Sequence, residues 1–389
     1  MLTRALYIFI LLGWLTACAA PMPSPIATPL PTPEVTSSPA PRLYPLPPRL
    51  PSPTYGIQAF VWWTIGNKTA SNDLGLVRDM GFGWLKHKFG WRDIELRRGE
   101  FDWTRTDAIV AALPEYNLKL LARLDAHPYW SRADEVDNGP PDEVQDFGNF
   151  CRALAQRYAG RIAAYEVWNE PNLARDWGNQ PPDPAAYVEL LKVCYLAIKA
   201  ADPQAIVISA GLAPTGTDDP AISMPDEQFY IEMYEAGAAP YFDMLGVHAP
   251  GYMNPPELSP AEAEADPNLQ ARWITFRHVE DIRAIMEKYG DGDKQIAITE
   301  MGWTTDKVNV TYAWFAVTEE QQADYLVRAY QYAKQNWSPW IGLMSMIYIA
   351  DPFWTEQQEQ YWWAITRPVF PGDPPVLLPA YEALKKMEK

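Results

Sequence analysis

Short apolar runs alternate with longer amphipathic stretches from about residue 55 to the carboxyl end of the chain. The apolar runs have the length and the β-branched and aromatic content of buried strands. They cover residues 56–62, 84–89, 118–124, 162–168, 206–209, 242–247, 295–299 and 342–349. The stretches between them predict helices, among them residues 144–158, 185–200, 274–289 and 319–336. This alternation predicts an α/β fold.

Eight strands with intervening helices favour a closed (β/α)8 TIM barrel. Residues 55–389 have room for eight strand–helix units of about 40 residues, and no second Pro/Ser-rich break divides them. We therefore expect one domain there. A doubly wound open sheet is the alternative, but no Gly-rich phosphate-binding sequence follows the first strand, where Trp62-Trp63-Thr64-Ile65 stands.

The first 54 residues lack the alternation of apolar runs and amphipathic stretches that marks the rest of the chain. Residues 1–17 contain an apolar run that is shorter than the roughly 20 residues of a membrane span, which predicts an export signal. Leu15-Thr16-Ala17-Cys18 resembles the signal of bacterial lipoproteins, and an ordinary signal peptide with an incidental cysteine is the alternative. Residues 18–54, rich in Pro, Ser and Thr, predict a disordered linker. We therefore expect a lipidated Cys18 that anchors the chain to the outer face of a bacterial membrane, at the cell surface.

Two of the predicted strands stop at a glutamate. Glu170 stands in Trp168-Asn169-Glu170-Pro171-Asn172, where proline cannot continue a central strand, and Glu300 ends the run Gln295-Ile296-Ala297-Ile298-Thr299-Glu300. A single glutamate at a strand end is more often a solvated residue or an ion-pair partner. Two such residues at the carboxyl-end face of one barrel, where these barrels keep their active sites, indicate paired acid/base chemistry.

The first motif, together with Thr299-Glu300-Met301-Gly302-Trp303, resembles the fourth-strand acid/base and seventh-strand nucleophile motifs of glycoside hydrolase clan A, nearest to families 39 and 5. The resemblance covers nearly all of residues 55–389. It implies a retaining β-glycoside hydrolase with Glu300 as nucleophile and Glu170 as acid/base. The expected cell-surface location favours a β-linked oligo- or polysaccharide as substrate, such as β-glucan, xylan, mannan or exopolysaccharide. It implies neither a cofactor nor a metal. The alternative is a catalytically inactive barrel that binds carbohydrate at the cell surface.

The same resemblance implies roles for further residues. Asn169 would donate to the 2-hydroxyl of the sugar, and His248 would lie near the nucleophile. The next aromatic residue is Tyr252, because Pro250 stands at the usual tyrosine position. Lys86 replaces the usual arginine of the second strand and would hydrogen-bond the nucleophile less directionally.

Three residues are weaker candidates for substrate binding. His127 ends the third strand and would line the donor subsite, although a solvated loop histidine is equally consistent with the sequence. The 17 tryptophans suit stacking on sugar rings, and Trp303 and Trp354 are our candidates among those near strand ends, with core packing as the alternative.

Other carboxylates compete with the pair. Asp125 and Asp351 also end strands, and Glu166 shares the face of Glu170. Glu166 would lie roughly 13 Å deeper in the barrel, where an ion pair with Lys86 or Arg123 is the better interpretation.

The net charge, the histidines and the cysteines indicate which ligands and bonds the chain can have. A net charge of −17 disfavours nucleic acid, and the four histidines form no His-x-His or His-Glu-x-x-His pattern for a metal. Cys151 and Cys194 fall in consecutive predicted helices. An exported chain can oxidise them, but neighbouring helices lie about 8–10 Å apart, so two buried thiols are favoured over a disulfide. We expect a monomer that meets the membrane only through its lipid anchor.

Overall fold

A computed structural model describes residues 41–62, 64–65, 72–134, 136–369 and 373–389 of the 389-residue chain. The predicted signal peptide, Cys18 and the linker as far as residue 40 lie outside the described residues.

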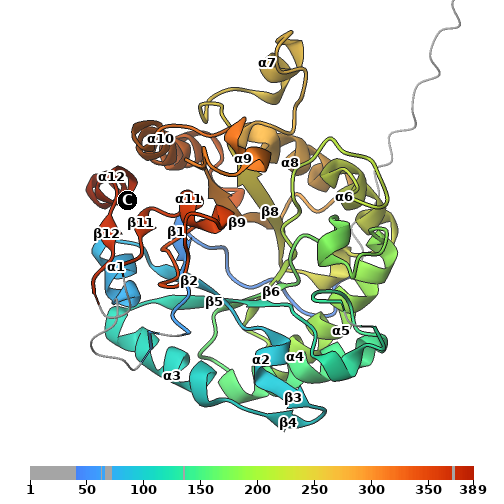
Figure 1. The fold of residues 1–389 in the computed structure, drawn as a ribbon. Helices are drawn as coiled ribbons and strands as arrows, with labels where there is room; N and C mark the ends of the chain where they lie inside the picture. The colour runs from blue at the N-terminus through green and yellow to red at the C-terminus, as the bar shows by residue number, and fades with distance from the viewer. Residues whose placement is uncertain (1–40, 63, 66–71, 135, 370–372) are drawn as a thin grey trace, which may run out of the picture. The chain divides into compact units, whose positions relative to one another are not determined.

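Eight parallel strands close into a barrel in the order β1-β10-β9-β8-β7-β6-β5-β2. Figure 1 looks along this barrel and shows helices around its strands. The strands are β1 (Thr54–Gln58), β2 (Trp84–Lys88), β5 (Lys119–Leu124), β6 (Ala164–Val167), β7 (Ile206–Ser209), β8 (Met244–Pro250), β9 (Gln295–Gly302) and β10 (Ile341–Met346). Each overlaps one of the eight predicted runs, so the predicted TIM barrel is confirmed.

The barrel interior changes from apolar to charged along the strands. One buried cluster fills its lower part: Trp84, Leu121, Ala164, Ile206, Ile208, Met244, Ala297 and Leu343. Side chains two positions later on a strand face the same way. Lys86, Arg123 and Glu166 therefore follow Trp84, Leu121 and Ala164 on the inner face, nearer the carboxyl ends of the strands. The fold thus delivers charged groups to the floor of the carboxyl-end face.

The helices are α1 (Asp73–Asp79), α2 (Trp91–Ile94), α3 (Thr104–Ala112), α4 (Val144–Tyr158), α5 (Pro184–Ala201), α6 (Asp226–Glu235), α7 (Pro260–Ala265), α8 (Val279–Lys288), α9 (Val310–Ala313), α10 (Glu319–Asn336), α11 (Glu359–Trp363) and α12 (Pro379–Lys386). The α4 and α10 helices have the predicted bounds. A capping box between Thr318 and Gln321 fixes where α10 begins, because it satisfies backbone N–H groups at that end. Among the described residues, no helix combines the length and the apolar character that crossing a bilayer requires.

Short elements complete the described chain. Two-stranded sheets form from β3 (Glu95–Arg97) with β4 (Glu100–Phe101) and from β11 (Thr366–Arg367) with β12 (Val376–Leu377). Single 3-10 turns cover Leu113–Tyr116, Tyr129–Ser131, Ala174–Asp176, Ala239–Tyr241 and Phe276–His278.

The end of the predicted linker contacts the barrel instead of remaining disordered. Arg42 donates to Asp293 at 2.8 Å and 2.9 Å, and Arg49 donates to the carbonyl oxygen of Asp293. The N–H of Leu50 donates to the side chain of Gln295, the first residue of β9. These contacts use two arginines and one backbone amide, whereas the prediction rested on the proline content, so the expectation of disorder is wrong for residues 42–50.

Cys151 and Cys194 form a disulfide between α4 and α5, with their Cα atoms 5.4 Å apart. The expectation of two free thiols is therefore wrong. Gly148, one turn before Cys151, explains the close approach: a Cβ atom there would lie 3.1 Å from the Cβ of Val193, the neighbour of Cys194. Without that side chain, α4 and α5 come near enough for the sulfurs to meet.

Replacing both cysteines by serine is expected to lower the free energy of unfolding. The disulfide closes a loop of 43 residues, and the loss of this constraint on the unfolded chain is worth roughly 4 kcal/mol. Denaturant unfolding of the double variant and of the parent, each with and without reductant, measures the difference. Reductant should destabilise the parent and leave the variant unchanged; equal stability of the oxidised and reduced parent would contradict the disulfide.

Candidate active site

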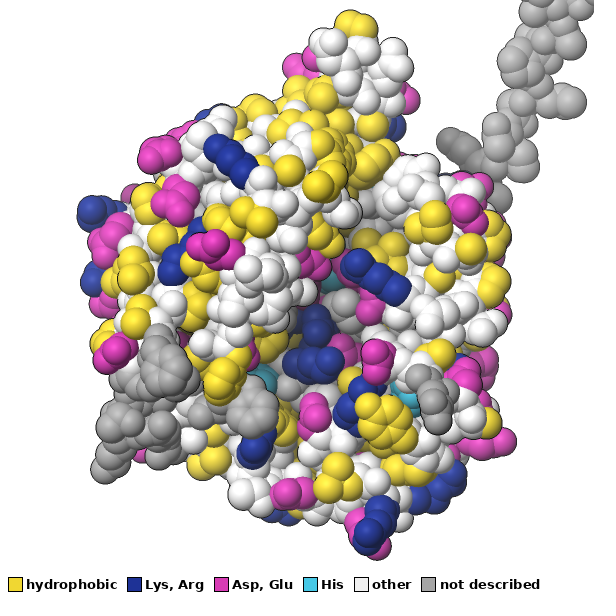
Figure 2. All heavy atoms as spheres, in the orientation of Figure 1, with side chains coloured by type: hydrophobic (Ala, Val, Ile, Leu, Met, Phe, Trp, Pro, Cys, Tyr) yellow, Lys and Arg dark blue, Asp and Glu magenta, His cyan; other side chains and the backbone are white. Residues whose placement is uncertain are grey.

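A cavity of about 620 Å³ opens at the carboxyl ends of the barrel strands. Both Glu170 and Glu300 line it, together with residues from the segments after β7, β8 and β10. Figure 2 shows this face hollowed near its centre, with basic and acidic side chains gathered in the hollow. The structure therefore brings the two predicted carboxylates into one cavity.

The turn after β6 positions Glu170. Trp168 and Glu170 have φ angles of 74° and 43°, in the left-handed region that is costly for residues other than glycine. Buried contacts hold this turn: the indole N–H of Trp168 donates to the carbonyl of Asp176 at 3.0 Å, and the N–H of Glu170 donates to the carbonyl of Gly211 at 3.1 Å. Gly211 must lack a side chain, since a Cβ atom there would collide with the ring of His248.

Glu300 is held between two cations. One of its oxygens lies 3.1 Å from the Lys86 ammonium and 3.0 Å from the Arg123 guanidinium, and its side chain is 12% exposed. Burial alone would raise the pKa of Glu300, but the charges of Lys86, His248 and Arg123 outweigh it and lower the pKa to about 2. This carboxylate is therefore ionised at any ordinary pH.

Glu170 has a different environment. Its two oxygens lie 3.0 Å from Nδ1 of His248 and 3.4 Å from the guanidinium of Arg175, whose side chain is 64% exposed. Burial acts to raise the pKa of Glu170, as does the charge of Glu300, but the hydrogen bond to His248 and the charges of His248 and Arg175 outweigh them and lower it. Unlike the partners of Glu300, Arg175 can turn toward solvent.

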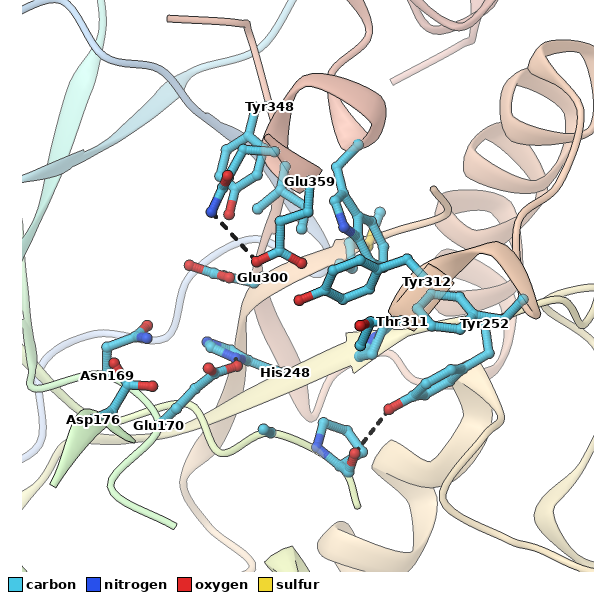
Figure 3. A pocket seen from close by; sticks show the side chains of 18 of the residues that line it. Asn169, Glu170, Asp176, His248, Tyr252, Glu300, Thr311, Tyr312, Tyr348 and Glu359 are labelled. Carbon is cyan, nitrogen blue, oxygen red and sulfur yellow. Dashed lines mark hydrogen bonds and ion pairs between the residues drawn. The ribbon is translucent and has the colours of Figure 1, made fainter. Parts of the chain in front are cut away.

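His248 links the two carboxylates. It pairs with Glu300 in the register of β8 and β9, so it lies near that residue as predicted, yet its hydrogen bond goes to Glu170. Tyr252 lines the cavity, and its hydroxyl donates to the carbonyl of Pro214 at 2.8 Å (Figure 3). Tyr252, Thr311 and Tyr312 stand on the side of the cavity away from Asn169 and Asp176 (Figure 3).

Asn169 lines the cavity beside the pair. Its side-chain oxygen accepts from the guanidinium of Arg123 at 3.0 Å, the same guanidinium that contacts Glu300. Because this contact occupies the amide oxygen, the amide N–H groups are left to donate. The geometry suits the donor role predicted for Asn169.

Lys86 occupies a deeper position than the cavity lining. It is 1% exposed, lies 2.8 Å from Glu166, and donates to the carbonyl of Thr299 at 3.1 Å. The interpretation of Glu166 as a buried partner of Lys86 is confirmed. Asp125 pairs with Arg123 and Lys88, and Asp351 accepts from the backbone of Phe353, so both competing carboxylates have structural partners.

The tryptophan candidates do not line the cavity as predicted. Trp303 is 0% exposed, and its indole N–H donates to the carbonyl of Asn254, so the ring has no surface for a sugar and the prediction is wrong. Trp354 is half-buried and packs edge-on against Tyr348, which lines the cavity. His127 is also buried and outside the lining; burial is the main cause that lowers its pKa to about 4.

Several cavity residues were missed by the sequence analysis. Arg123 was considered only as a partner of Glu166, although its two-residue spacing from Leu121 placed it on the inner face. Arg175, Asp176, Tyr348 and Glu359 also line the cavity. Burial and the charge of Glu170 raise the pKa of Asp176 to about 6. Arg175 and Asp176 lie in a 3-10 turn and Glu359 begins α11, segments too short for a periodic pattern, whereas Tyr348 stands in the predicted run 342–349 and was overlooked there.

One group of side chains in the described residues has the spacing of metal ligands. Ligand atoms of Glu227, His278 and Asp281 lie within 4.8 Å of one another. However, the two ring nitrogens of His278 lie 3.0 Å from Asp226 and 3.1 Å from Asp281. Burial alone would lower the pKa of His278, but these carboxylates raise it to about 10. A protonated ring has no lone pair for a metal, so we interpret this group as an ion-pair cluster.

A comparison of the sequence with known protein families identifies one family that matches most of the barrel. The family described as "Glycosyl hydrolases family 39" matches residues 59–333, more than half of the chain. The chain belongs to glycosyl hydrolase family 39. Within this family 39 chain, Glu170 and Glu300 both fall inside the matched residues. No protein with a curated description matches the sequence.

Solved structures share the fold of the family 39 chain at low sequence identity. A family 39 glycoside hydrolase from Bacteroides cellulosilyticus WH2 is 20% identical with a TM-score of 0.61 over 87% of this chain. This chain spans 64% of that enzyme's length, which is less than two thirds. A GH39 β-xylosidase from Caulobacter crescentus is 19% identical (TM-score 0.56, covering 90% of this chain and 72% of that one). Xylanase 10B from Thermotoga maritima is 15% identical (TM-score 0.54, covering 86% and 94%).

Proposed function

We propose that the chain is a retaining glycoside hydrolase that cleaves β-linked oligo- or polysaccharides, with Glu300 as nucleophile and Glu170 as acid/base. The observation that carries the proposal is the difference between the electrostatic environments of the two carboxylates, which line one cavity. Two cations hold Glu300 ionised, whereas Glu170 contacts a histidine and one exposed arginine. A nucleophile needs the first environment, and a group that must gain and lose a proton needs the second.

The reaction would take two steps. First, an oxygen of Glu300 bonds to the anomeric carbon while the bond to the leaving oxygen breaks, and Glu170 gives its proton to that oxygen. Second, Glu170 removes a proton from water, the water oxygen bonds to the anomeric carbon, and Glu300 departs. Asn169, fixed through its oxygen by Arg123, donates to the 2-hydroxyl as positive charge develops on the ring.

Glu170 must acquire a proton before the first step. In the free protein its pKa is lowered by His248 and Arg175, so the ionised form prevails at neutral pH. A bound sugar displaces water and further buries the carboxyl group, which favours the protonated form. The exposed Arg175 can leave Glu170 for the sugar hydroxyls, and this removes a cation that favours ionisation.

Hydrolysis of a panel of β-linked oligosaccharides tests the proposed function. Xylo-oligosaccharides come first, because two structural neighbours are named β-xylosidase and xylanase. NMR follows the anomeric configuration of the product as it forms. Release of β-products supports a retaining mechanism; α-products would remove the nucleophile role of Glu300. Binding without turnover across the panel would favour a non-catalytic carbohydrate-binding barrel.

Arg175→Gln is expected to move the alkaline limb of the kcat/KM profile to higher pH. The profile falls as pH rises through the pKa of the free acid, and the variant removes a cation that lowers the pKa of Glu170. Measuring kcat/KM against pH for the variant and the parent gives the shift. Arg175→Lys keeps the charge and serves as the control, with a limb close to that of the parent. A limb at the same pH in Arg175→Gln and the parent would show that Arg175 does not control Glu170.

A further inference from the structure

We infer that a second cavity, beside the first, binds the leaving-group end of a neutral β-linked oligosaccharide of three or more units. The inference rests on the proposed function, because it extends the substrate beyond the bond that is cut. It assigns a binding site to a part of the surface that contains neither Glu170 nor Glu300.

The second cavity has a volume of about 600 Å³, similar to that of the first. One wall is the face of α6 that carries Glu227, Gln228 and Glu232. The opposite wall is the segment from Gln270 to Trp273, and the loop after β7 closes one end with Thr215 and Gly216. Three separate segments therefore line an open cavity of a size suited to a small ligand.

The two cavities share a thin partition. Tyr252 lines the first and Trp273 lines the second, and their rings touch edge to face with centroids 5.1 Å apart. Pro214 of the first cavity and Thr215 of the second are consecutive residues, and the Tyr252 hydroxyl donates to the carbonyl of Pro214. A chain of sugars that leaves the first cavity over Tyr252 would therefore meet Trp273 next.

The position of the partition relative to Glu170 shows which end of a bound oligosaccharide would enter the second cavity. Glu170 protonates the departing oxygen, so the sugars beyond it belong to the leaving group. The loop after β7, which carries Pro214 and Thr215, is bound to the turn that holds Glu170: the N–H of Glu170 donates to the carbonyl of Gly211, and the side chain of Asn172 bonds the backbone of Ala213. Glu300 is held from the other side, by Lys86 of β2 and Arg123 of β5. The second cavity thus extends from the acid/base side of the site.

The lining matches the chemistry of a neutral saccharide. Trp273 is half-buried and offers an apolar ring of the kind that stacks on sugar faces. Gln228 is exposed and donates to the half-buried Glu232 at 2.8 Å, and each side chain retains groups that can bond hydroxyls. The one cation in the lining, Arg272, already pairs with Glu264 and Asp281. Acidic side chains outnumber it, which disfavours an anionic sugar.

An ion-pair cluster makes the walls rigid. Protonated His278, just before α8, contacts Asp226 at the start of α6 and Asp281 of α8. Arg272 of the opposite wall contacts Asp281 as well. Since both walls bind to the same group of charges, the cavity keeps its shape without a ligand, and a preformed site binds with a smaller ordering cost.

Calorimetric titration of the Glu300→Gln protein tests the inference without turnover. The probes are neutral β-1,4-linked xylo-, gluco- and manno-oligosaccharides, each as a disaccharide and as a hexasaccharide. The expected result is tighter binding of the hexasaccharide of at least one series. Adding Trp273→Ala should weaken that binding about tenfold while the disaccharide affinity stays unchanged. Gln228→Ala should act in the same direction, and it avoids any loss of packing around Trp273.

Trp340→Ala is the matched control, because Trp340 is also half-buried but precedes β10 and lines neither cavity. It should leave both affinities unchanged. The inference fails if both Trp273→Ala and Gln228→Ala leave the hexasaccharide affinity intact or weaken both probes equally, or if no hexasaccharide binds better than its disaccharide. Length-dependent binding through Trp273 in a protein whose parent shows no turnover would keep the inference and remove the proposed function.

Discussion

Glu300→Gln is expected to lose on the order of 10⁴- to 10⁶-fold in kcat, the range found when a catalytic nucleophile is removed. Glutamine keeps the shape of the side chain but has no oxygen able to displace the leaving group. The fold should survive, because Lys86 retains Glu166 and Arg123 retains Asp125 when the charge of Glu300 is removed. Initial rates on the preferred oligosaccharide, with thermal unfolding as a check of the fold, measure the effect.

Asp351→Asn is the matched control for that variant. Asp351 is a second buried carboxylate after a barrel strand, but it accepts from the backbone of Phe353 and does not line the cavity. Its replacement should leave kcat within a few-fold of the parent. Activity of Glu300→Gln comparable with that of Asp351→Asn would mean that another group attacks the sugar.

Glu170→Ala should make the rate depend on the leaving group. Substrates whose leaving oxygen needs a proton are expected to lose about 10²- to 10⁴-fold in kcat, the usual contribution of a general acid. An activated aryl glycoside leaves without a proton, so its first step should be nearly unaffected and the covalent intermediate should accumulate. Initial rates on a series of aryl glycosides, plotted against the pKa of the leaving phenol, measure this dependence.

Azide distinguishes the roles of the two residues. In Glu170→Ala, azide needs no general base and can attack the covalent intermediate, so it should raise the rate and give a β-glycosyl azide. In Glu300→Ala no intermediate forms, and azide can only attack the substrate directly, which gives the α-azide. A β-azide from Glu300→Ala, or an α-azide from Glu170→Ala, would reverse the assignment.

The barrel strands were predictable because their signal is local. The eight apolar runs alternate with longer amphipathic stretches, and α4 and α10 have the bounds that their amphipathic spacing indicated. Glu170 and Glu300 were predictable for the same reason, since each ends a run. The disulfide was not, because it depends on the approach of two helices that Gly148 permits, and the effect of one missing side chain on helix spacing has no periodic signature.

The surroundings of the pair were only partly predictable. The two-residue period of its strand could have placed Arg123 on the inner face of the barrel. Its contacts with Glu300 and Asn169, however, depend on the register between neighbouring strands, which the sequence does not reveal. Arg175 lies in the 3-10 turn Ala174–Asp176 and Glu359 begins the short helix α11, and a single sequence does not reveal the paths of the loops that place these short elements at the cavity. Trp303 was misjudged because a tryptophan beside a catalytic motif has the same sequence signal whether its ring faces a ligand or the core.

The buried ion pair between Lys86 and Glu166, beside Glu300, has a consequence for protein engineering. Lys86 and Glu166 are 1% and 0% exposed in a barrel whose next layer down is apolar. A design procedure that optimises thermostability would replace such a pair by well-packed aliphatic residues, because replacing a buried ion pair in this way often stabilises the fold. Here the substitution would also remove one of the two cations beside Glu300. Positions 86 and 166 should therefore be held fixed in any redesign that aims to keep the proposed activity of this barrel.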